Sequence, residues 1–337
     1  MRVSEFEYQL PDEAIAQSPV EPRHASRLLD TRDLTDHRFV DLPRLLEPGD
    51  LVVVNETKVR AARLIGHRSD TGGRVELLLL DRRPDGLWDA LAKPARRLRP
   101  GVRVEFRGLA AIVRSAATEG VVTVDLAAEE LESAIEAAGS VPLPPYFTGS
   151  LIDDSRYQTV FANEIGSAAA PTAGLHFTTE VMMALEKRGI EMATVDLHVS
   201  LDTFRPIAVE DIEDHRMHTE WCRLPAQTAE AVAEARRRGQ KVVAVGTTVV
   251  RTLETFGNDT GRVSAGEKRT DLFIRPGYEF RVVDAMVTNF HIPGSTLLVM
   301  LAAFMGERWR SAYEVALKRG YRFLSFGDAM YAERLRP

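Results

Sequence analysis

Three short segments of this chain combine small residues with side chains that bind ligands or exchange protons. The first, residues 170–177, reads Ala-Pro-Thr-Ala-Gly-Leu-His-Phe. Its proline lies three residues before Gly174, so the backbone is expected to be irregular. Its polar side chains are Thr172 and His176, and an imidazole titrates near neutral pH. The segment is typical of a binding loop, but it also fits a buried turn whose histidine only satisfies a neighbour.

The second segment, Gly246-Thr247-Thr248, is expected to join a buried strand to a helix. Free amides and the positive end of the helix dipole favour an anion there, such as a carboxylate or a phosphate. Arg251, one turn into the helix, either adds a cation or pairs with Glu254. The alternative is a tight turn with capping threonines. The segment is not a Walker loop, and no Gly-x-Gly-x-x-Gly follows a strand, so no dinucleotide-type cofactor is expected.

The third segment, residues 288–295, supplies Asn289 and His291 and ends at Ser295, an expected helix N-cap. It is a polar loop that leads into a helix, as residues 170–177 are. The two segments are therefore predicted to form two walls of one pocket.

A fourth group suggests metal chemistry as an alternative. His215 and His218 stand three residues apart with Glu220 close by, and on a helix the two imidazoles would share a face. Metal sites usually need another ligand and an oriented second shell, and no third ligand follows at helical spacing. We therefore expect substrate contact or plain hydrogen bonding here, and no metal.

The middle of the chain has the texture of a small antiparallel β-barrel. Short strand-like runs alternate with turn residues, as barrels require. The runs are Arg74–Leu80, Leu87–Ala92, Val102–Phe106, Ala110–Arg114 and Val121–Leu126. A helix at Glu129–Ala138 and the proline-rich stretch Val141–Tyr146 follow, and the latter can only be extended. We predict an inserted barrel over residues 61–141.

The flanking residues, 1–60 and 142–337, alternate strands with helices, which predicts a mixed α/β body. The predicted strands are Leu51–Val54, Glu191–Val199, Lys241–Val245, Asp271–Arg275 and Tyr321–Phe326. The predicted helices are Thr179–Arg188, Ala226–Arg238, Val249–Phe256, one beginning after Ser295, and Arg310–Lys318. Asn55–Lys58 follows the first strand at its carboxyl end, a usual location for a site in α/β proteins.

Charge is distributed unevenly along the 337 residues. The whole chain has a formal net charge of −6. Residues 60–125, however, hold 13 Lys and Arg against 8 Asp and Glu, a net of +5, and are densest at Arg96, Arg97 and Arg99. Such a run is commonly a solvated face, but a basic module on an acidic protein also suits contact with phosphates.

The remaining composition is that of a cytoplasmic protein. Cys222 is the single cysteine, which excludes an internal disulfide and fits a reducing compartment. The N-terminus lacks the apolar core of a signal peptide. The most apolar window, Thr296–Met305, is shorter than the ~20 residues that span a bilayer. We expect no membrane association, and a monomer.

Taken together, the motifs resemble those of the S-adenosylmethionine:tRNA ribosyltransferase-isomerase family of queuosine biosynthesis. The resemblance runs nearly end to end, and its motifs occur in the family's order. They are Leu10-Pro11, Ile15–Gln17, Val54–Thr57, Pro142–Tyr146, Arg156–Val160, Ala169–Phe177, Leu197–Val199, Thr203-Phe204, His215-x-Met217-His218-x-Glu220, Val245–Thr248 with Arg251, Thr288–His291, Ser295–Leu297, and Tyr321–Phe323 through Gly327–Met330.

The resemblance implies a mixed α/β body with an inserted barrel, and a definite reaction. The ribosyl group of S-adenosylmethionine is transferred to 7-aminomethyl-7-deazaguanine at the wobble position of a tRNA anticodon and is isomerised. The product is epoxyqueuosine, and adenine and methionine leave. S-adenosylmethionine is then a co-substrate and ribosyl donor, so no cofactor is implied. The rival readings are a metal-dependent hydrolase and a non-catalytic RNA-binding protein.

This chemistry needs a base beside the sulfonium-activated carbon, an acid for departing adenine and a neutral attacking amine, roles that suit histidines. We hypothesise that His176, His198, His218 and His291 meet in one pocket. The expected substrate-binding residues are Thr172, Gly174, Gly246, Thr247, Thr248, Arg251, Asn289, Ser295 and Glu220. Within this set, the 246–248 turn with Arg251 is expected to hold the methionine carboxylate. The basic barrel, through its three arginines, is expected to hold tRNA phosphates.

The chain departs from the family pattern beside His198. The family usually carries glycines where this chain has Ser200 and Asp202. If those glycines permit positive φ, the two replacements must reach the same conformation differently, and Asp tolerates the left-handed region better than most residues.

Overall fold

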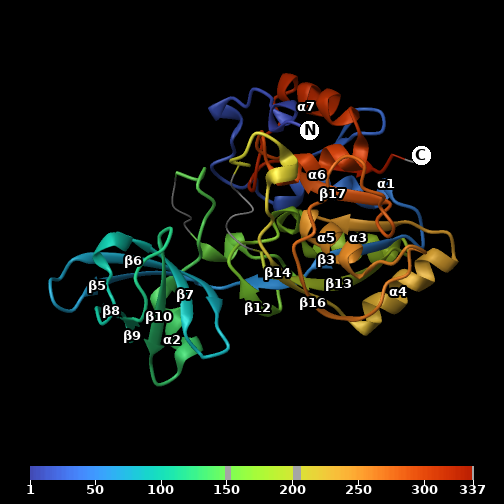
Figure 1. Ribbon diagram of the computed structural model, residues 1–337. Helices are drawn as coiled ribbons and strands as arrows, with labels where there is room; N and C mark the ends of the chain where they lie inside the picture. Colours follow the sequence, from blue (N-terminus) through green and yellow to red (C-terminus); the bar gives the residue numbers. More distant parts are fainter. Residues whose placement is uncertain (149–152, 200–205, 336–337) are drawn as a thin grey trace. The chain divides into compact units, whose positions relative to one another are not determined.

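The computed structural model describes residues 1–148, 153–199 and 206–335 (Figure 1). Ser200 and Asp202 lie outside these described residues. The chain forms two compact units. One contains Met1–Lys58, Pro144–Glu164 and Ala170–Pro337, and the other contains Val59–Leu143 and Ile165–Ala169. No helix in the described ranges combines the length and apolarity needed to cross a membrane.

A nine-stranded mixed sheet organises the first unit. Its spatial order is β16 (Gly266–Thr270), β14 (Glu220–Leu224), β13 (Glu191–Leu197), β3 (Leu51–Asn55), β15 (Val242–Val245), β17 (Ala285–Asn289), β18 (Ala329–Glu333), β1 (Arg27–Asp30) and β2 (Thr35–Arg38). Strands β13, β3, β15 and β17 run parallel to one another, and β18 is antiparallel to β17. The carboxyl ends of the four parallel strands therefore lie along one edge, where ligands bind in open α/β sheets.

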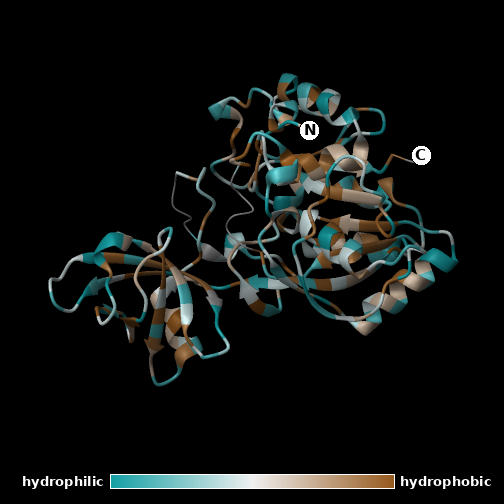
Figure 2. Cartoon of the chain, in the orientation of Figure 1, coloured by the Kyte–Doolittle hydropathy of each residue, from teal (hydrophilic) through white to brown (hydrophobic). Residues whose placement is uncertain are grey.

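Helices cover this sheet because its central strands are apolar on both faces. Every residue of β3, β15 and β17 is buried. The helices are α1 (Leu42–Leu45), α3 (Thr179–Lys187), α4 (Ala226–Arg237), α5 (Thr247–Phe256), α6 (Thr296–Met305) and α7 (Arg308–Lys318). In Figure 2 the central strands are brown and α4 and α7 show teal on their exposed sides, the amphipathic pattern of helices that pack on a core.

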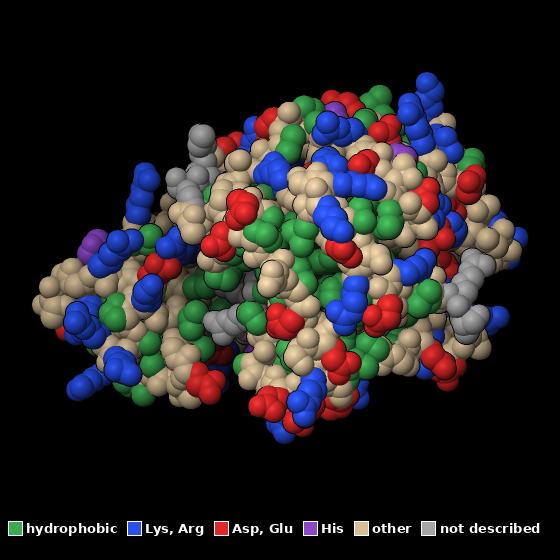
Figure 3. Space-filling view, turned by 90° about the horizontal axis from the view of Figure 1, so that it is seen from above, with side chains coloured by type: hydrophobic (Ala, Val, Ile, Leu, Met, Phe, Trp, Pro, Cys, Tyr) green, Lys and Arg blue, Asp and Glu red, His purple; other side chains and the backbone are tan. Residues whose placement is uncertain are grey.

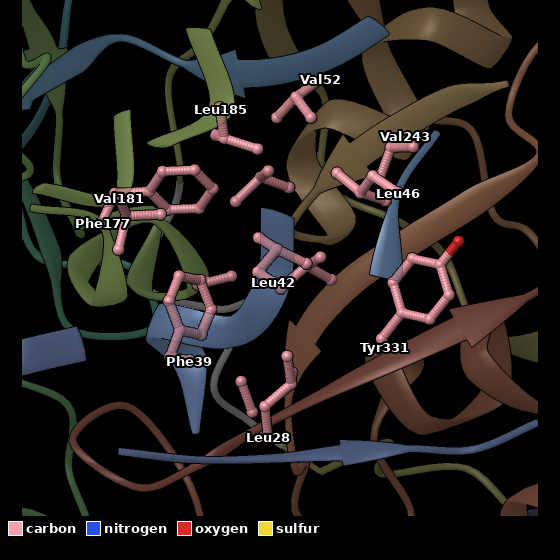
Figure 4. Packing of buried hydrophobic residues seen from close by; sticks show 14 of the residues in the cluster. Leu28, Phe39, Leu42, Leu46, Val52, Phe177, Val181, Leu185, Val243 and Tyr331 are labelled. Atoms are coloured by element: carbon pink, nitrogen blue, oxygen red, sulfur yellow. The ribbon is translucent and has the colours of Figure 1, made fainter. Parts of the chain in front are cut away.

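One core cluster joins the sheet to the helices on one of its faces. Val52 and Val243 of the sheet pack with Leu42, Phe177 and Leu185 from α1, the 170–177 segment and α3 (Figure 4). Successive strand residues point to opposite faces, so Val53 and its equivalents face the other layer. This packing fixes the 170–177 segment, which contains the 3-10 helix Thr172–His176, against the sheet.

The second unit is a closed antiparallel barrel of six strands. They are β5 (Arg63–Arg68), β6 (Arg74–Arg82), β7 (Trp88–Lys93), β10 (Val121–Ala127), β9 (Leu109–Val113) and β8 (Arg103–Phe106), and β8 pairs back with β5. Helix α2 (Leu131–Ala138) contributes Ile135 to the barrel core, and β11 (Gly139–Ser140) pairs with β5. Strands β4 (Thr57–Val59) and β12 (Glu164–Ser167) form a separate two-stranded sheet. The predicted fold class, an α/β body with a small antiparallel barrel, is confirmed.

Two predicted strands were wrong. Residues 271–275 are irregular, because Arg251 takes the carbonyl of Leu272, and the neighbouring edge strand is the charged Gly266–Thr270 instead. Residues 321–326 form a turn, in which Leu324 has a left-handed φ of 69°, and the following strand begins only at Ala329. The apolar side chains of residues 321–326 are buried within this turn, whereas in residues 271–275 only Ile274 is buried.

Candidate active site

A pocket of about 590 Å³, measured with its open mouth, lies at the carboxyl edge of the parallel strands in the first unit. Gly246 follows β15, Asn289 ends β17, and Val199 follows β13, so three of the four parallel strands deliver residues to it. The full lining is Tyr146, Ala170, Pro171, Thr172, Ala173, Val199, Gly246, Thr247, Thr248, Thr288, Asn289, Phe290, His291, Ile292, Leu297, Leu324 and Ser325. The predicted two walls, 170–177 and 288–295, thus do meet in one pocket.

The N-terminus of α5 forms one end of this pocket. Gly246 has a φ of 87°, which an L side chain rarely adopts, and its amide donates to the Val287 carbonyl at 2.8 Å. The first amides of α5 have no intrahelical acceptor. Thr248 is only 8% exposed, and its Oγ1 has no hydrogen-bond partner in the described residues. This end of the pocket is therefore rich in unused donors.

A second wall, beside the N-terminus of α5, is a hydrogen-bonded chain that ends at Thr172. The Thr172 Oγ1 lies 3.0 Å from Asn289 Oδ1, and Asn289 Nδ2 lies 3.0 Å from His176 Nε2. His176 Nδ1 lies 2.7 Å from the Ser26 hydroxyl, and its ring stacks on Phe39. His176 is fully buried behind Asn289 and does not line the pocket. Burial, with the nearby positive charges of two arginines, lowers the pKa of His176 well below its usual value.

His291 is the histidine that lines the pocket among the described residues. Its Nε2 lies 3.1 Å from Thr288 Oγ1. Tyr313 accepts a hydrogen bond from the His291 amide at 2.9 Å, and Tyr8 donates one to its carbonyl at 2.5 Å. Burial lowers the pKa of His291 to about 3. The imidazole is therefore neutral near pH 7, and its backbone is held on both sides by the two tyrosine hydroxyls.

A third wall joins two residues that sequence reasoning did not single out. The Tyr146 and Ser325 hydroxyls lie 2.5 Å apart, and burial raises the pKa of Tyr146 to about 12. Tyr146 comes from the proline-rich stretch and Ser325 from the turn before β18. The only sequence signal for Tyr146 was its place in the Pro142–Tyr146 motif. Ser26 was also missed, because its contact with His176 spans 150 residues of sequence.

None of the described lining residues is Asp, Glu, Lys or Arg. Arg251, expected to face the carboxylate, instead forms a buried ion pair with Glu220 and also donates to the carbonyls of Leu272 and Thr270. Its other expected partner, Glu254, is occupied by the backbone amides of residues 281–283. Arg251 and Glu220 therefore support the base of α5 and stand outside the pocket lining.

Four other predicted site residues also lie outside the lining. His198 is half-buried with its ring 4.5 Å from that of Trp221, and His218 is exposed. Gly174 is buried where a Cβ would come within 2.9 Å of Phe161, so its role is close packing. Ser295 caps α6 by accepting the Leu298 amide at 3.2 Å. The polar run Asn55–Lys58 likewise contributes no lining residue, since Asn55 bonds to β13.

His215 and His218 do not share a helix face, because the short 3-10 helix there ends at Asp214 and both residues follow it. Glu220 is committed to Arg251. Across the described ranges, no group of three or more His, Cys, Asp or Glu side chains is placed to hold a metal ion.

The barrel carries the predicted basic cluster on its surface. Arg96, Arg97 and Arg99 are exposed, and within the described part of the chain none has an acidic partner within 4.0 Å. Other barrel arginines are paired, such as Arg103 with Glu105 and Arg114 with Asp125. Lys and Arg side chains, blue in Figure 3, project from the barrel where few acidic side chains accompany them.

Comparison with known proteins places the chain in a family. A family model described as "Queuosine biosynthesis protein" matches residues 3–332. The S-adenosylmethionine:tRNA ribosyltransferase-isomerases of Moorella thermoacetica and Heliobacterium modesticaldum are each 50% identical, over 98% of this chain and 99% of theirs. The crystal structure of S-adenosylmethionine tRNA ribosyltransferase from Thermotoga maritima matches with a TM-score of 0.55 and 37% identity, covering 97% of this chain and 99% of that one. The chain therefore belongs to the queuosine biosynthesis protein family, that of the S-adenosylmethionine:tRNA ribosyltransferase-isomerases.

Proposed function

We propose that this protein transfers and isomerises the ribosyl group of S-adenosylmethionine onto 7-aminomethyl-7-deazaguanine in tRNA. The product is epoxyqueuosine-tRNA, and adenine and methionine are released. The observation that carries this assignment is the match at 50% identity along nearly the whole chain to relatives with that name. We place the modified base at the anticodon wobble position, and we place the enzyme in the cytoplasm as a monomer with no cofactor beyond the donor itself.

We assign the reaction to the pocket that contains His291. The pocket is lined by apolar side chains together with a few polar groups, which is the usual composition of small-molecule sites. A sulfonium acidifies the adjacent ribosyl carbon, and a neutral imidazole is able to accept the proton that leaves it. His291 is neutral because of its burial. It is the leading candidate for this proton transfer, with the Tyr146 and Ser325 hydroxyls as further hydrogen-bonding groups.

His176, His198 and His218 are given supporting roles in this scheme. His176 contacts Asn289, which lines the pocket, whereas His198 and His218 lie outside the described lining. Alanine variants of each, assayed for adenine release at saturating donor, rank their contributions. A variant with an unchanged rate is removed from the scheme.

We assign tRNA contact to the barrel arginines. Arg96, Arg97 and Arg99 are exposed and close together in sequence, which suits contact with successive phosphates. The pocket would then read the modified base while the barrel holds the backbone.

The assay for the function is incubation of the full chain with S-adenosylmethionine and precursor-bearing tRNA. We expect free adenine, free methionine and a mass gain in the anticodon loop equal to the transferred ribosyl group. Transfer of a methyl group, or hydrolysis of the donor with unchanged tRNA, would overturn the proposal.

A further inference from the structure

The chain of hydrogen bonds from Ser26 to Thr172 has a fixed direction. The Asn289 side chain has one nitrogen and one oxygen, and its Nδ2 lies 3.3 Å from the Asp328 backbone carbonyl as well as 3.0 Å from His176 Nε2. A carbonyl only accepts hydrogen bonds, so the nitrogen of the amide must lie on that side. The Oδ1 therefore faces Thr172.

This orientation sets the proton positions along the chain. His176 Nε2 must accept from Asn289, so the ring proton lies on Nδ1 and is donated to Ser26. Protonation of His176 would put two donors against each other, in a site that already disfavours a charged ring. At the other end, the Thr172 hydroxyl must donate to Asn289 Oδ1. The Thr172 oxygen consequently presents only lone pairs to the pocket.

The N-terminus of α5 lies beside Thr172 and has the opposite character. A Cβ at Gly246 would lie 3.5 Å from the Cβ of Ala173, so the two segments are in contact. On the α5 side the pocket offers unused amide donors and the Thr248 hydroxyl, which is buried and unpartnered in the described residues. One end of the pocket thus places a hydrogen-bond acceptor next to a donor-rich, anion-binding helix terminus.

We propose that this end of the pocket is an α-amino-acid subsite, which holds the methionine half of S-adenosylmethionine. The carboxylate binds the α5 N-terminus and Thr248, and the ammonium group donates to Thr172. Ser26, His176 and Asn289 are positioning residues that keep Thr172 an acceptor. This inference rests on the proposed function. In this inference uncharged donors bind the carboxylate in place of Arg251, because Arg251 forms a buried ion pair with Glu220.

The test measures binding of three probes to the full chain by calorimetry, with and without precursor-bearing tRNA. The probes are S-adenosylmethionine, its decarboxylated analogue, and methylthioadenosine, which has no amino-acid group. Loss of a hydrogen bond to a charged group weakens binding about 10- to 100-fold. Thr248→Val should weaken the binding of S-adenosylmethionine by that factor and leave the affinities for the other two probes unchanged. Thr172→Val should weaken the binding of S-adenosylmethionine and of its decarboxylated analogue, and it should leave the affinity for methylthioadenosine unchanged.

Thr252→Val is the matched control, since Thr252 is a buried threonine of the same helix whose hydroxyl bonds to the Thr248 carbonyl and which does not line the pocket. It should leave the affinity ratios among the probes unchanged. If Thr172→Val and Thr248→Val weakened the binding of methylthioadenosine as strongly as that of S-adenosylmethionine, the amino-acid subsite would be refuted. The proposal that the pocket binds S-adenosylmethionine would remain. Absence of binding of any probe to the unmodified protein would overturn the proposed function as well.

The positioning role of His176 has its own readout. His176→Gln keeps a side-chain oxygen able to accept from Asn289, whereas His176→Leu removes the acceptor at similar volume. The two variants are compared once their melting temperatures are shown to be equal. The Gln variant should keep the preference for S-adenosylmethionine over methylthioadenosine, and the Leu variant should lose most of this preference. If adenine release at saturating donor were abolished in the Gln variant while this preference was kept, His176 would be a proton-transfer group and the positioning role would be wrong.

Discussion

Glu220 and Arg251 form an ion pair in which the side chains are only 4% and 5% exposed. Glu220 starts β14 and Arg251 lies one turn into α5, so the pair fixes the helix whose N-terminus closes the pocket. A buried charge that loses its partner is strongly destabilising, whereas the intact pair need not be stabilising relative to an apolar pair.

Replacing Glu220 should therefore destabilise the fold. Glu220→Ala leaves the Arg251 guanidinium buried without its carboxylate, and we expect a loss of about 3–5 kcal/mol in the free energy of unfolding. Urea denaturation measures it. Glu234→Ala, which removes a half-buried carboxylate that pairs with Arg237 and Arg238 at the surface of α4, is the control and should change little. An equally small effect of Glu220→Ala would mean that the ion pair does not hold α5.

Lowering the pH should reduce the free energy of unfolding, because the buried histidines resist protonation in the folded chain. The pKa of His291 is about 3 in the folded chain, and that of an unfolded histidine is about 6.5. Between these values the unfolded chain binds more protons. For each such histidine, the free energy of unfolding is unaffected above pH 6.5. Below pH 6.5 it falls by up to about 1.4 kcal/mol for each pH unit.

The variant His291→Gln should show a shallower loss of unfolding free energy between pH 6.5 and 4 than the unmodified protein. Urea denaturation at several pH values measures both slopes, and carboxylates contribute equally to the two proteins. Identical slopes would contradict the lowered pKa of His291.

The left-handed backbone at Gly246 should be needed for binding as well as for stability. Gly246→Ala forces a φ of 87° on an L residue, at a cost of about 1–2 kcal/mol, and shifts the first amides of α5. Gly239→Ala is the matched control, because its φ is 73° and a Cβ there meets open space. Both variants should melt lower, but only Gly246→Ala should weaken binding of S-adenosylmethionine. Equal donor affinities in the two variants would exclude the α5 N-terminus from the site.

The barrel arginines should govern the salt dependence of tRNA binding. Each phosphate contact adds about one to the slope of log affinity against log salt. Arg96, Arg97 and Arg99 changed together to Gln should reduce that slope by about three. The control triple, Arg63, Arg103 and Arg114 changed to Gln, removes the same charge from arginines that already pair with carboxylates. If both triples changed the slope equally, net charge would explain binding and the specific assignment would be lost.

Local sequence pattern predicted the elements that depend on local rules. Leu51–Val54 is short, β-branched and bounded by a turn, and it forms a fully buried strand. The helices before Gly189 and Gly239 end where those glycines adopt positive φ. The strand at 329–333 escaped prediction, because the apolar run before it is used in a turn around Asp328, whose carboxylate accepts the amides of Arg27 and Arg322.

The sequence predicted which loops line the pocket, but it did not predict the roles of the individual side chains. Thr172, Gly246–Thr248, Asn289 and His291 were identified from irregular backbone next to strand ends, and they line one pocket. The histidines could not be ranked from sequence, because His176 and His291 differ through tertiary contacts. His176 is enclosed by Phe39 and Ser26, whereas His291 opens to the pocket.

The most direct test of the pocket as the place of ribosyl transfer is single-turnover adenine release by His291→Ala. The reaction uses saturating S-adenosylmethionine and precursor-bearing tRNA, and His37→Ala, on the edge strand β2, is the control. Loss of a proton-transfer group typically costs about 10²- to 10⁴-fold in rate. We predict a loss in that range for His291→Ala and an unchanged rate for His37→Ala. Adenine release by His291→Ala at the unmodified rate, with the same mass gain in the tRNA, would contradict the assignment of this pocket.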